Sequence, residues 1–192
     1  LLQVLFDGLP DDRSLLRDPL HYLAQYLDMI EINSTFYRIP DAAQARSWAE
    51  RVSDYPGFYF SAKLHQDFTH HGPYPRERVE PFRKGLEPLA QAGRLRHLLA
   101  QFRYDFSDVP ETRERLTGLA GEWNPFCNLV LELRHNSWQE PNAFDFLKTL
   151  GVTVANLDYP LGKTSFDLPV IGIGSQAYLR LHGRNQKAWF DK

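Results

Sequence analysis

Short apolar segments alternate with amphipathic helices along most of this chain, and this regularity constrains the fold more than any other feature. Six segments are apolar at alternate positions and have the length of β-strands. Helices between consecutive strands favour parallel pairing, because a parallel connection needs a crossover of a dozen or more residues. The expected strands are Met29–Asn33, Phe58–Lys63, Leu95–Gln101, Asn128–Arg134, Val152–Asp158 and Ala177–His182.

The helices between these strands have recognisable ends. Asp18 before Pro19 is typical of an N-cap followed by proline in the first turn, and Asp41 is a suitable cap for the next helix. Pro88 should kink or break the third helix. We expect helices from Pro19 toward Asp28, from Asp41 to a point before Pro56, over Val79–Ala92, from Asp108 and Pro110, and from Glu140 and Pro141 to Gly151; residues 159–176 should form a loop, and residues 1–6 a further strand or its remnant.

The two faces of the expected strands differ, which favours a closed barrel over an open sheet. In a doubly wound sheet helices cover both faces, so both should be apolar. Here one face stays apolar while the other becomes polar toward the strand ends, as where Leu131 and Leu133 alternate with Glu132 and Arg134. Charged groups at so many strand ends need a shared site that is partly exposed to solvent, and the mouth of a barrel is such a site. We therefore expect a TIM-type (β/α) barrel.

Composition places the chain among globular proteins and narrows its partners. It has 192 residues, of which 43% are hydrophobic, and a net charge of −2 from 22 basic and 24 acidic residues. This balance argues against a general nucleic-acid coat or a membrane-surface protein but leaves room for a local basic groove. Cys127 is the single cysteine, so no internal disulfide can form and a cytoplasmic location is expected. We expect one domain over residues 1–192 and no membrane span.

Several sequence blocks, taken in order, resemble one known family. They are Glu31–Pro40 (EINSTFYRIP), Phe60–Lys63 (FSAK), Thr69–His70, Gln101–Phe102, Glu132–Trp138 (ELRHNSW) and Arg180–Arg184 (RLHGR). Together they look like the YecE-like family, which is catalogued as domain of unknown function number seventy-two. The resemblance runs from about Tyr22 to Trp189. It implies a TIM-type barrel, in agreement with the strand pattern, and it implies no particular reaction.

Two departures from the family pattern concern the ends of the barrel. Family members begin with a strand that carries a Gly-Trp motif, which is not found in this chain. They also continue beyond the His-Gly-Arg block to a last strand, whereas this chain stops at Lys192. A complete barrel of this type has ~250 residues. We therefore expect a barrel that is incomplete or truncated at its first and last strands.

Two of the expected strands carry the strongest candidate site. Glu132 and Arg134 alternate on one strand and so point the same way, and Arg180 and His182 repeat this arrangement on a later strand. Glu132 and His182 are the candidate acid/base pair, while Lys63, Arg134 and Arg180 would bind an anion. The alternative is a set of internal ion pairs that only neutralises buried charge.

Further side chains at the strand ends and in the following loops complete the candidate binding set. Tyr37 and Trp138 would stack on a sugar or a base, or would plug the top of the barrel. Arg184 would add a planar donor for phosphate or carboxylate, and His70 matches a position of the family pattern. The full set is Glu31, Asn33, Tyr37, Lys63, His70, Gln101, Arg134, Trp138, Asn156, Arg180 and Arg184.

These residues support three functional hypotheses. The first is an enzyme or binding protein for a small anionic or phosphorylated molecule, with the question of catalysis left open. The second is a nucleic-acid-binding or phosphodiester-processing protein, which the weakly acidic chain disfavours. The third is a non-catalytic scaffold. The sequence requires no cofactor, and a metal site is not favoured because cations accompany the potential ligands His65, Glu132, Asp158 and His182.

Overall fold

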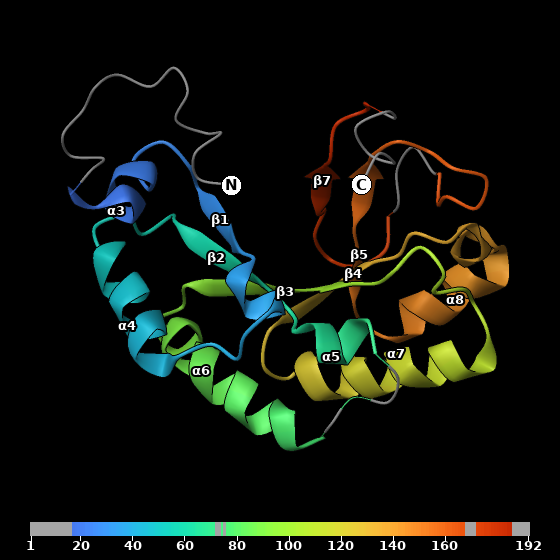
Figure 1. Ribbon diagram of the computed structural model, residues 1–192, viewed down its shortest axis with the longest axis horizontal. Helices are drawn as coiled ribbons and strands as arrows, with labels where there is room; N and C mark the ends of the chain where they lie inside the picture. The colour runs from blue at the N-terminus through green and yellow to red at the C-terminus, as the bar shows by residue number, and fades with distance from the viewer. Residues whose placement is uncertain (1–16, 72–73, 75, 168–171, 186–192) are drawn as a thin grey trace.

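A five-stranded parallel sheet forms the centre of the protein in the computed structural model, which describes residues 17–71, 74, 76–167 and 172–185 (Figure 1). Its strands follow the chain in the order β1-β2-β3-β4-β5, and a second parallel pair consists of β6 and β7. The further strand expected over residues 1–6 lies outside the described residues. The strands are β1 (Met29–Ile32), β2 (Tyr59–Lys63), β3 (Leu95–Gln101), β4 (Asn128–Glu132), β5 (Thr153–Val154), β6 (Asn156–Asp158) and β7 (Leu179–Leu181).

The expected helices are present, with one difference at a helix end and one inside a helix. The first ends at Leu23 rather than near Asp28, because the chain then closes a tighter turn in which the Tyr26 N–H donates to the Leu23 carbonyl. The third continues through Pro88, since Leu86 and Leu89 on either side are fully buried and hold that turn in the core. The helices are α3 (Pro19–Leu23), α4 (Ala42–Arg51), α5 (Gln66–Thr69), α6 (Val79–Gln91), α7 (Pro110–Trp123) and α8 (Pro141–Thr149), with 3₁₀ turns η1 (Ser34–Phe36), η2 (Arg76–Arg78) and η3 (Asn136–Gln139).

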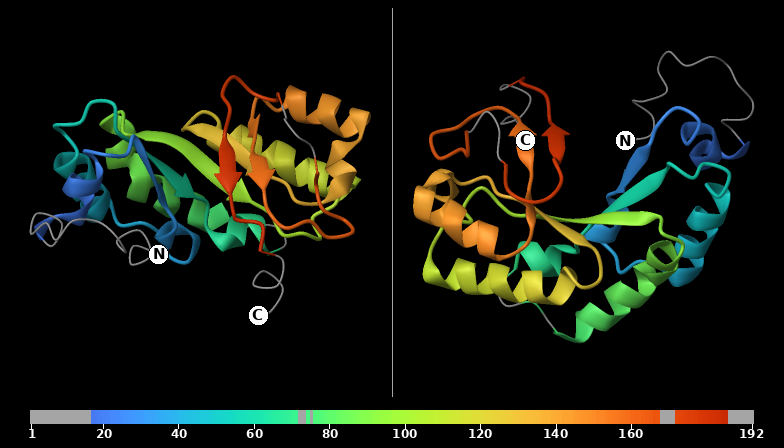
Figure 2. Two further views of the ribbon diagram at one scale, coloured as in Figure 1. Left: turned by 90° about the horizontal axis from the view of Figure 1, so that it is seen from above. Right: turned by 180° about the vertical axis from the view of Figure 1, so that it is seen from behind.

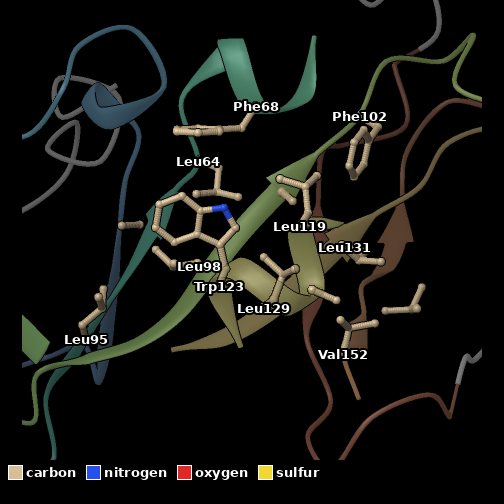
Figure 3. Close-up of a cluster of buried hydrophobic side chains, with 14 of the residues drawn as sticks. Leu64, Phe68, Leu95, Leu98, Phe102, Leu119, Trp123, Leu129, Leu131 and Val152 are labelled. Atoms are coloured by element: carbon tan, nitrogen blue, oxygen red, sulfur yellow. The ribbon is translucent and has the colours of Figure 1, made fainter. Parts of the chain in front are cut away.

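Helices α4, α6, α7 and α8 lie against the convex face of the curved sheet (Figure 2). The apolar side chains of the strands point to these helices, as the alternation predicts. Leu98, Leu129 and Leu131 pack there against Trp123 and Phe68, all five being almost completely buried (Figure 3). This core fixes the register of the strands and turns their polar residues to the concave face.

Strands β1 and β7 stand at opposite ends of the concave face (Figure 2). A small apolar cluster lines the floor of this face, where Leu99 and Val130 contact Ala155 and Tyr178. Within the described residues no strand pairs β7 with β1, so the sheet is open here. The architecture is thus α/β with a parallel central sheet. The sequence predicts a TIM-type barrel that is incomplete at its first and last strands, and the described residues show the parallel sheet of such a barrel without its closure.

The strand expected over Val152–Asp158 is divided between the two sheets. The Ala155 N–H donates to the Leu131 carbonyl (2.9 Å) on β4, whereas the next N–H, of Asn156, donates to the Tyr178 carbonyl (2.7 Å) beside β7. The segment therefore joins the central sheet to the β6-β7 pair. Residues 159–167 and 172–176 form a loop as expected, apart from one bridge between His135 and Ser165. Among the described helices, none is long and apolar enough to span a membrane.

Candidate functional site

Arg180 on β7 joins polar residues from three other strands on the concave face. Its Nη2 donates to Glu31 Oε1 on β1 (2.7 Å), and its Nη1 donates to Gln101 Oε1 on β3 (3.1 Å). The same Nη1 forms an ion pair with Glu132 on β4. We call Glu31, Gln101, Glu132, Arg134 and Arg180 the Arg180 network. The sequence analysis predicted that these residues share one face, and the structure brings them into direct contact.

Glu132 is the most deeply buried member of the Arg180 network, with no exposed side-chain surface. Arg134 contacts Glu132 Oε1 through Nε (2.7 Å) and Nη2 (2.6 Å). Burial by itself would raise the pKa of Glu132, but the guanidinium groups of Arg134 and Arg180 outweigh it and hold this pKa below its ordinary value. Glu132 is therefore a carboxylate at neutral pH and cannot serve as a proton donor there.

His182 extends the Arg180 network at the end of β7. Its Nε2 lies 3.7 Å from Glu132 Oε1. Burial lowers the pKa of His182, and the attraction of Glu132 offsets this only in part. The imidazole is therefore mainly neutral at neutral pH. Of the two residues predicted to form an acid/base pair, His182 is the one whose protonation state suits proton transfer.

Tyr178 also belongs to this site, although the sequence analysis did not propose it. Its hydroxyl donates to Glu31 Oε2 (3.1 Å) and is hydrogen-bonded to Ser61 Oγ on β2 (2.9 Å). Burial raises the pKa of Tyr178, so the phenol stays protonated. The available signal was its position, because Tyr178 precedes Arg180 by two places in the chain and therefore faces the same way.

Lys63 ends β2 beside the Arg180 network and has a different environment. Its Nζ lies 4.2 Å from the centroid of the Phe36 ring. Within the described ranges no carboxylate lies at ion-pair distance from this amine. Burial and the charge of Arg180 lower the pKa of Lys63. The Thr35 hydroxyl donates to the Lys63 carbonyl (2.6 Å), which ties the loop after β1 to the end of β2.

His70 contacts the same phenyl ring. It packs edge-on against Phe36 with ring centroids 4.9 Å apart, and its Nδ1 is hydrogen-bonded to Thr69 Oγ1 (2.9 Å). Burial and then the charge of Lys63 lower the pKa of His70 to about 4. His70 is thus a neutral imidazole near a lysine, with Phe36 in contact with both. Phe36 is a further residue that the sequence analysis did not propose for the site.

Trp138 lies away from this cluster, in the core on the convex side. Its side chain has no exposed surface, its indole N–H donates to the Phe106 carbonyl (2.7 Å), and its ring stacks on Phe106. Trp138 is thus a core residue between the sheet and the helices. The predicted stacking on a ligand is not possible in this arrangement, because both faces of the ring are covered by the protein.

The remaining predicted residues are two exposed side chains and two half-buried asparagines. Tyr37 is 67% exposed and touches Phe36, while Arg184 is mostly exposed and its Nε donates to Asp158 Oδ1 (2.7 Å). Asn33 is half-buried directly after β1, and Asn156 is half-buried in β6. In the described parts of the chain, no group of three or more His, Cys, Asp and Glu side chains is arranged to hold a metal ion.

Comparison with known proteins points to one family. A family model described as "Protein of unknown function DUF72" matches residues 8–192. A crystal structure of a DUF72 family protein from Thermotoga maritima is similar, with a TM-score of 0.74 and 30% identity over 91% of this chain and 69% of that chain. One from Enterococcus faecalis has a TM-score of 0.79 and 23% identity over 92% of this chain and 73% of that chain. Among curated proteins, none matches.

Proposed function

Because this chain belongs to the DUF72 family, which is the YecE-like family, we propose its function from the site alone. Membership of that family indicates no particular activity. The proposed function is the binding of a small anionic or phosphorylated molecule at the carboxyl ends of the strands. Catalysis on that molecule, with His182 as proton acceptor beside Glu132, stays a prediction.

The proposal rests on an imbalance of charge. Among the described residues, three cationic side chains, Lys63, Arg134 and Arg180, stand beside two carboxylates, Glu31 and Glu132. Both guanidinium groups form ion pairs with these carboxylates, whereas in the described part of the chain the ammonium of Lys63 forms none. Asp158, a further carboxylate at a strand end, pairs with Arg184 instead. An anion placed near Lys63 would therefore be attracted by an ammonium group that pairs with no carboxylate among the described residues.

We also propose that the complete fold is a TIM-type barrel. Two contacts support closure, since Arg180 and Tyr178 beside β7 both reach Glu31 on β1 across the concave face. In such barrels substrates bind at the carboxyl ends of the strands, where the Arg180 network lies. The cytoplasmic location expected from the single cysteine stays a prediction.

Thermal unfolding in the presence of phosphates tests the anion site. A ligand at a hundred times its Kd stabilises the folded state by about 2.7 kcal/mol, which in a domain of this size raises Tm by on the order of 5–10 °C. We expect such a rise with inorganic phosphate or sugar phosphates and its loss in Lys63→Gln. The matched control is Lys84→Gln, because Lys84 is an exposed lysine on α6.

Ionic strength in this experiment is matched with chloride, since screening alone changes the effect of surface charges. A panel of phosphates that raises Tm no more than chloride does would contradict the proposed function. An equal rise in Lys63→Gln and the parent protein would place the anion elsewhere.

A further inference from the structure

Lys63 differs from an ordinary anion-binding lysine in how it is held. Its backbone is fixed at the end of β2 by the hydrogen bond from Thr35, and its Nζ rests against the face of Phe36. The two nearby carboxylates, of Glu31 and Glu132, form ion pairs with Arg134 and Arg180. The amine is thus partly shielded from water, has no carboxylate partner among the described residues and is held at a defined place in the site.

This environment raises the neutral fraction of the amine above that of an exposed lysine. Burial and the positive charges of Arg180 and Arg134 lower the pKa of Lys63, and they outweigh the opposing effect of Glu31 and Glu132. The contact with Phe36 acts in the opposite direction, because the face of the ring attracts an ammonium ion. The result is a larger neutral fraction than an exposed lysine has. A desolvated lysine beside other cations is the usual form of a nucleophilic lysine.

A neutral imidazole stands near this amine and can carry protons. The charge of Lys63 contributes to the lowered pKa of His70, so the two groups are within electrostatic reach of each other, and both contact Phe36. At about 4, the pKa of His70 leaves its ring unprotonated near neutral pH. Such a ring can accept a proton and pass it on.

From this arrangement we propose that Lys63 forms an imine with a small aldehyde or ketone that carries an anionic group. The inference rests on the proposed function, because the guanidinium groups of Arg134 and Arg180 beside the amine would hold the anionic group there when Lys63 reacts in its neutral form. The Lys63 amine adds to the carbonyl carbon, and the nitrogen loses one proton while the oxygen gains one. Loss of a second nitrogen proton and cleavage of the C–O bond then release one water molecule and leave C=N. His70 would relay these protons.

Reductive trapping tests this chemistry. The intact chain is incubated with glycolaldehyde phosphate and sodium cyanoborohydride, and the modified lysines are identified by peptide mass spectrometry. We expect labelling of Lys63 at least tenfold faster than labelling of the exposed Lys84 and Lys148. Uncharged glycolaldehyde, used in parallel, should label Lys63 more slowly. Equal labelling of the three lysines would overturn the proposal.

Two substitutions separate this inference from the proposed function. Lys63→Arg keeps the positive charge and removes the nucleophile, so it should retain a rise in Tm with inorganic phosphate and lose the trapped adduct. In His70→Gln the adduct should still form on Lys63, but several-fold more slowly. A rise in Tm with phosphate but no selective adduct would overturn the imine and leave the anion site standing. A selective adduct without any phosphate effect would support the imine and contradict the anion site.

Discussion

At the scale of single residues, burial and neighbouring charge decide which groups of the site are ionised. Glu132 is completely buried yet stays a carboxylate because two guanidinium groups contact it. In the described part of the chain His70 forms no ion pair, and burial keeps it neutral. Removing one member of a buried ion pair leaves an uncompensated charge. The Arg180 network should therefore be tested through residues at its margin, such as Lys63, rather than through its arginines.

His70 should make the stability of the protein sensitive to mild acid. Its folded-state pKa of about 4 lies below the ordinary value of 6.5. Between these values the unfolded chain binds a proton that the folded protein does not, so the free energy of unfolding falls as the pH falls through this window. We expect His70→Gln to lose less stability between pH 7 and pH 5 than the parent protein, as measured by urea unfolding.

The control for this measurement is His71→Gln, because His71 is the exposed neighbour of His70 and is 62% exposed. It should retain the loss of stability that His70 causes. An unchanged pH dependence in His70→Gln would show that other groups titrate in this window.

At the scale of elements, α6 packs closely against the end of the loop between β1 and α4. This contact supports the part of the site that contains Phe36. Gly85 on α6 faces the backbone of Pro40, and a Cβ at position 85 would lie 2.1 Å from the Pro40 carbonyl oxygen. No side chain fits at that distance, so glycine is required by the close approach rather than by its own backbone conformation. The loop that carries Phe36 thereby has a fixed support.

Two glycine-to-alanine changes on neighbouring helices should have opposite effects. Gly85→Ala forces α6 away from Pro40 and should destabilise the protein by on the order of 1–3 kcal/mol. Gly118→Ala, inside α7, meets among the described residues only the Tyr74 hydroxyl at 3.9 Å and should stabilise by up to ~1 kcal/mol through helix propensity. Urea unfolding of both variants measures this difference. Equal effects would mean that α6 is not packed as closely as described.

At the scale of the whole molecule, side chains on the concave face hold the β6-β7 pair against the five-stranded sheet. Arg180 reaches three strands, and Tyr178 adds hydrogen bonds to β1 and β2. Within the described residues the backbone link between the two sheets runs through Ala155 and its neighbours. The site therefore contributes to the assembly of the fold as well as to its chemistry.

Tyr178→Phe should loosen this connection while preserving the apolar floor. The variant removes the hydroxyl that bridges Ser61 and Glu31, with an expected cost of about 1–3 kcal/mol. Hydrogen exchange should become faster at the amides of β6 and β7 than at those of β3. Tyr59→Phe is the control, because no hydrogen bond involves the Tyr59 hydroxyl among the described residues. Uniform acceleration across all strands would contradict the prediction.

Local pattern was enough to predict most of the elements and the faces of the strands, but not the short helix α5 or the division of Val152–Asp158 into β5 and β6. The carboxylate caps Asp18 and Asp41 begin their helices as expected, and the expected range Leu95–Gln101 is that of β3. Alternation also assigned Glu132 and Arg180 to one face. These features depend on neighbours in the chain, since strand side chains alternate with a period of two and caps act within one turn.

Tertiary structure decided which groups meet on that face. Arg180 contacts Glu31, which lies 149 positions away in the chain, and only the folding of the sheet brings them together. The same folding leaves Lys63 without a carboxylate partner among the described residues, places Phe36 in contact with both Lys63 and His70, and covers both faces of Trp138. Alternation gives the face of a residue but not its partner, because the partner depends on strand order, curvature and register.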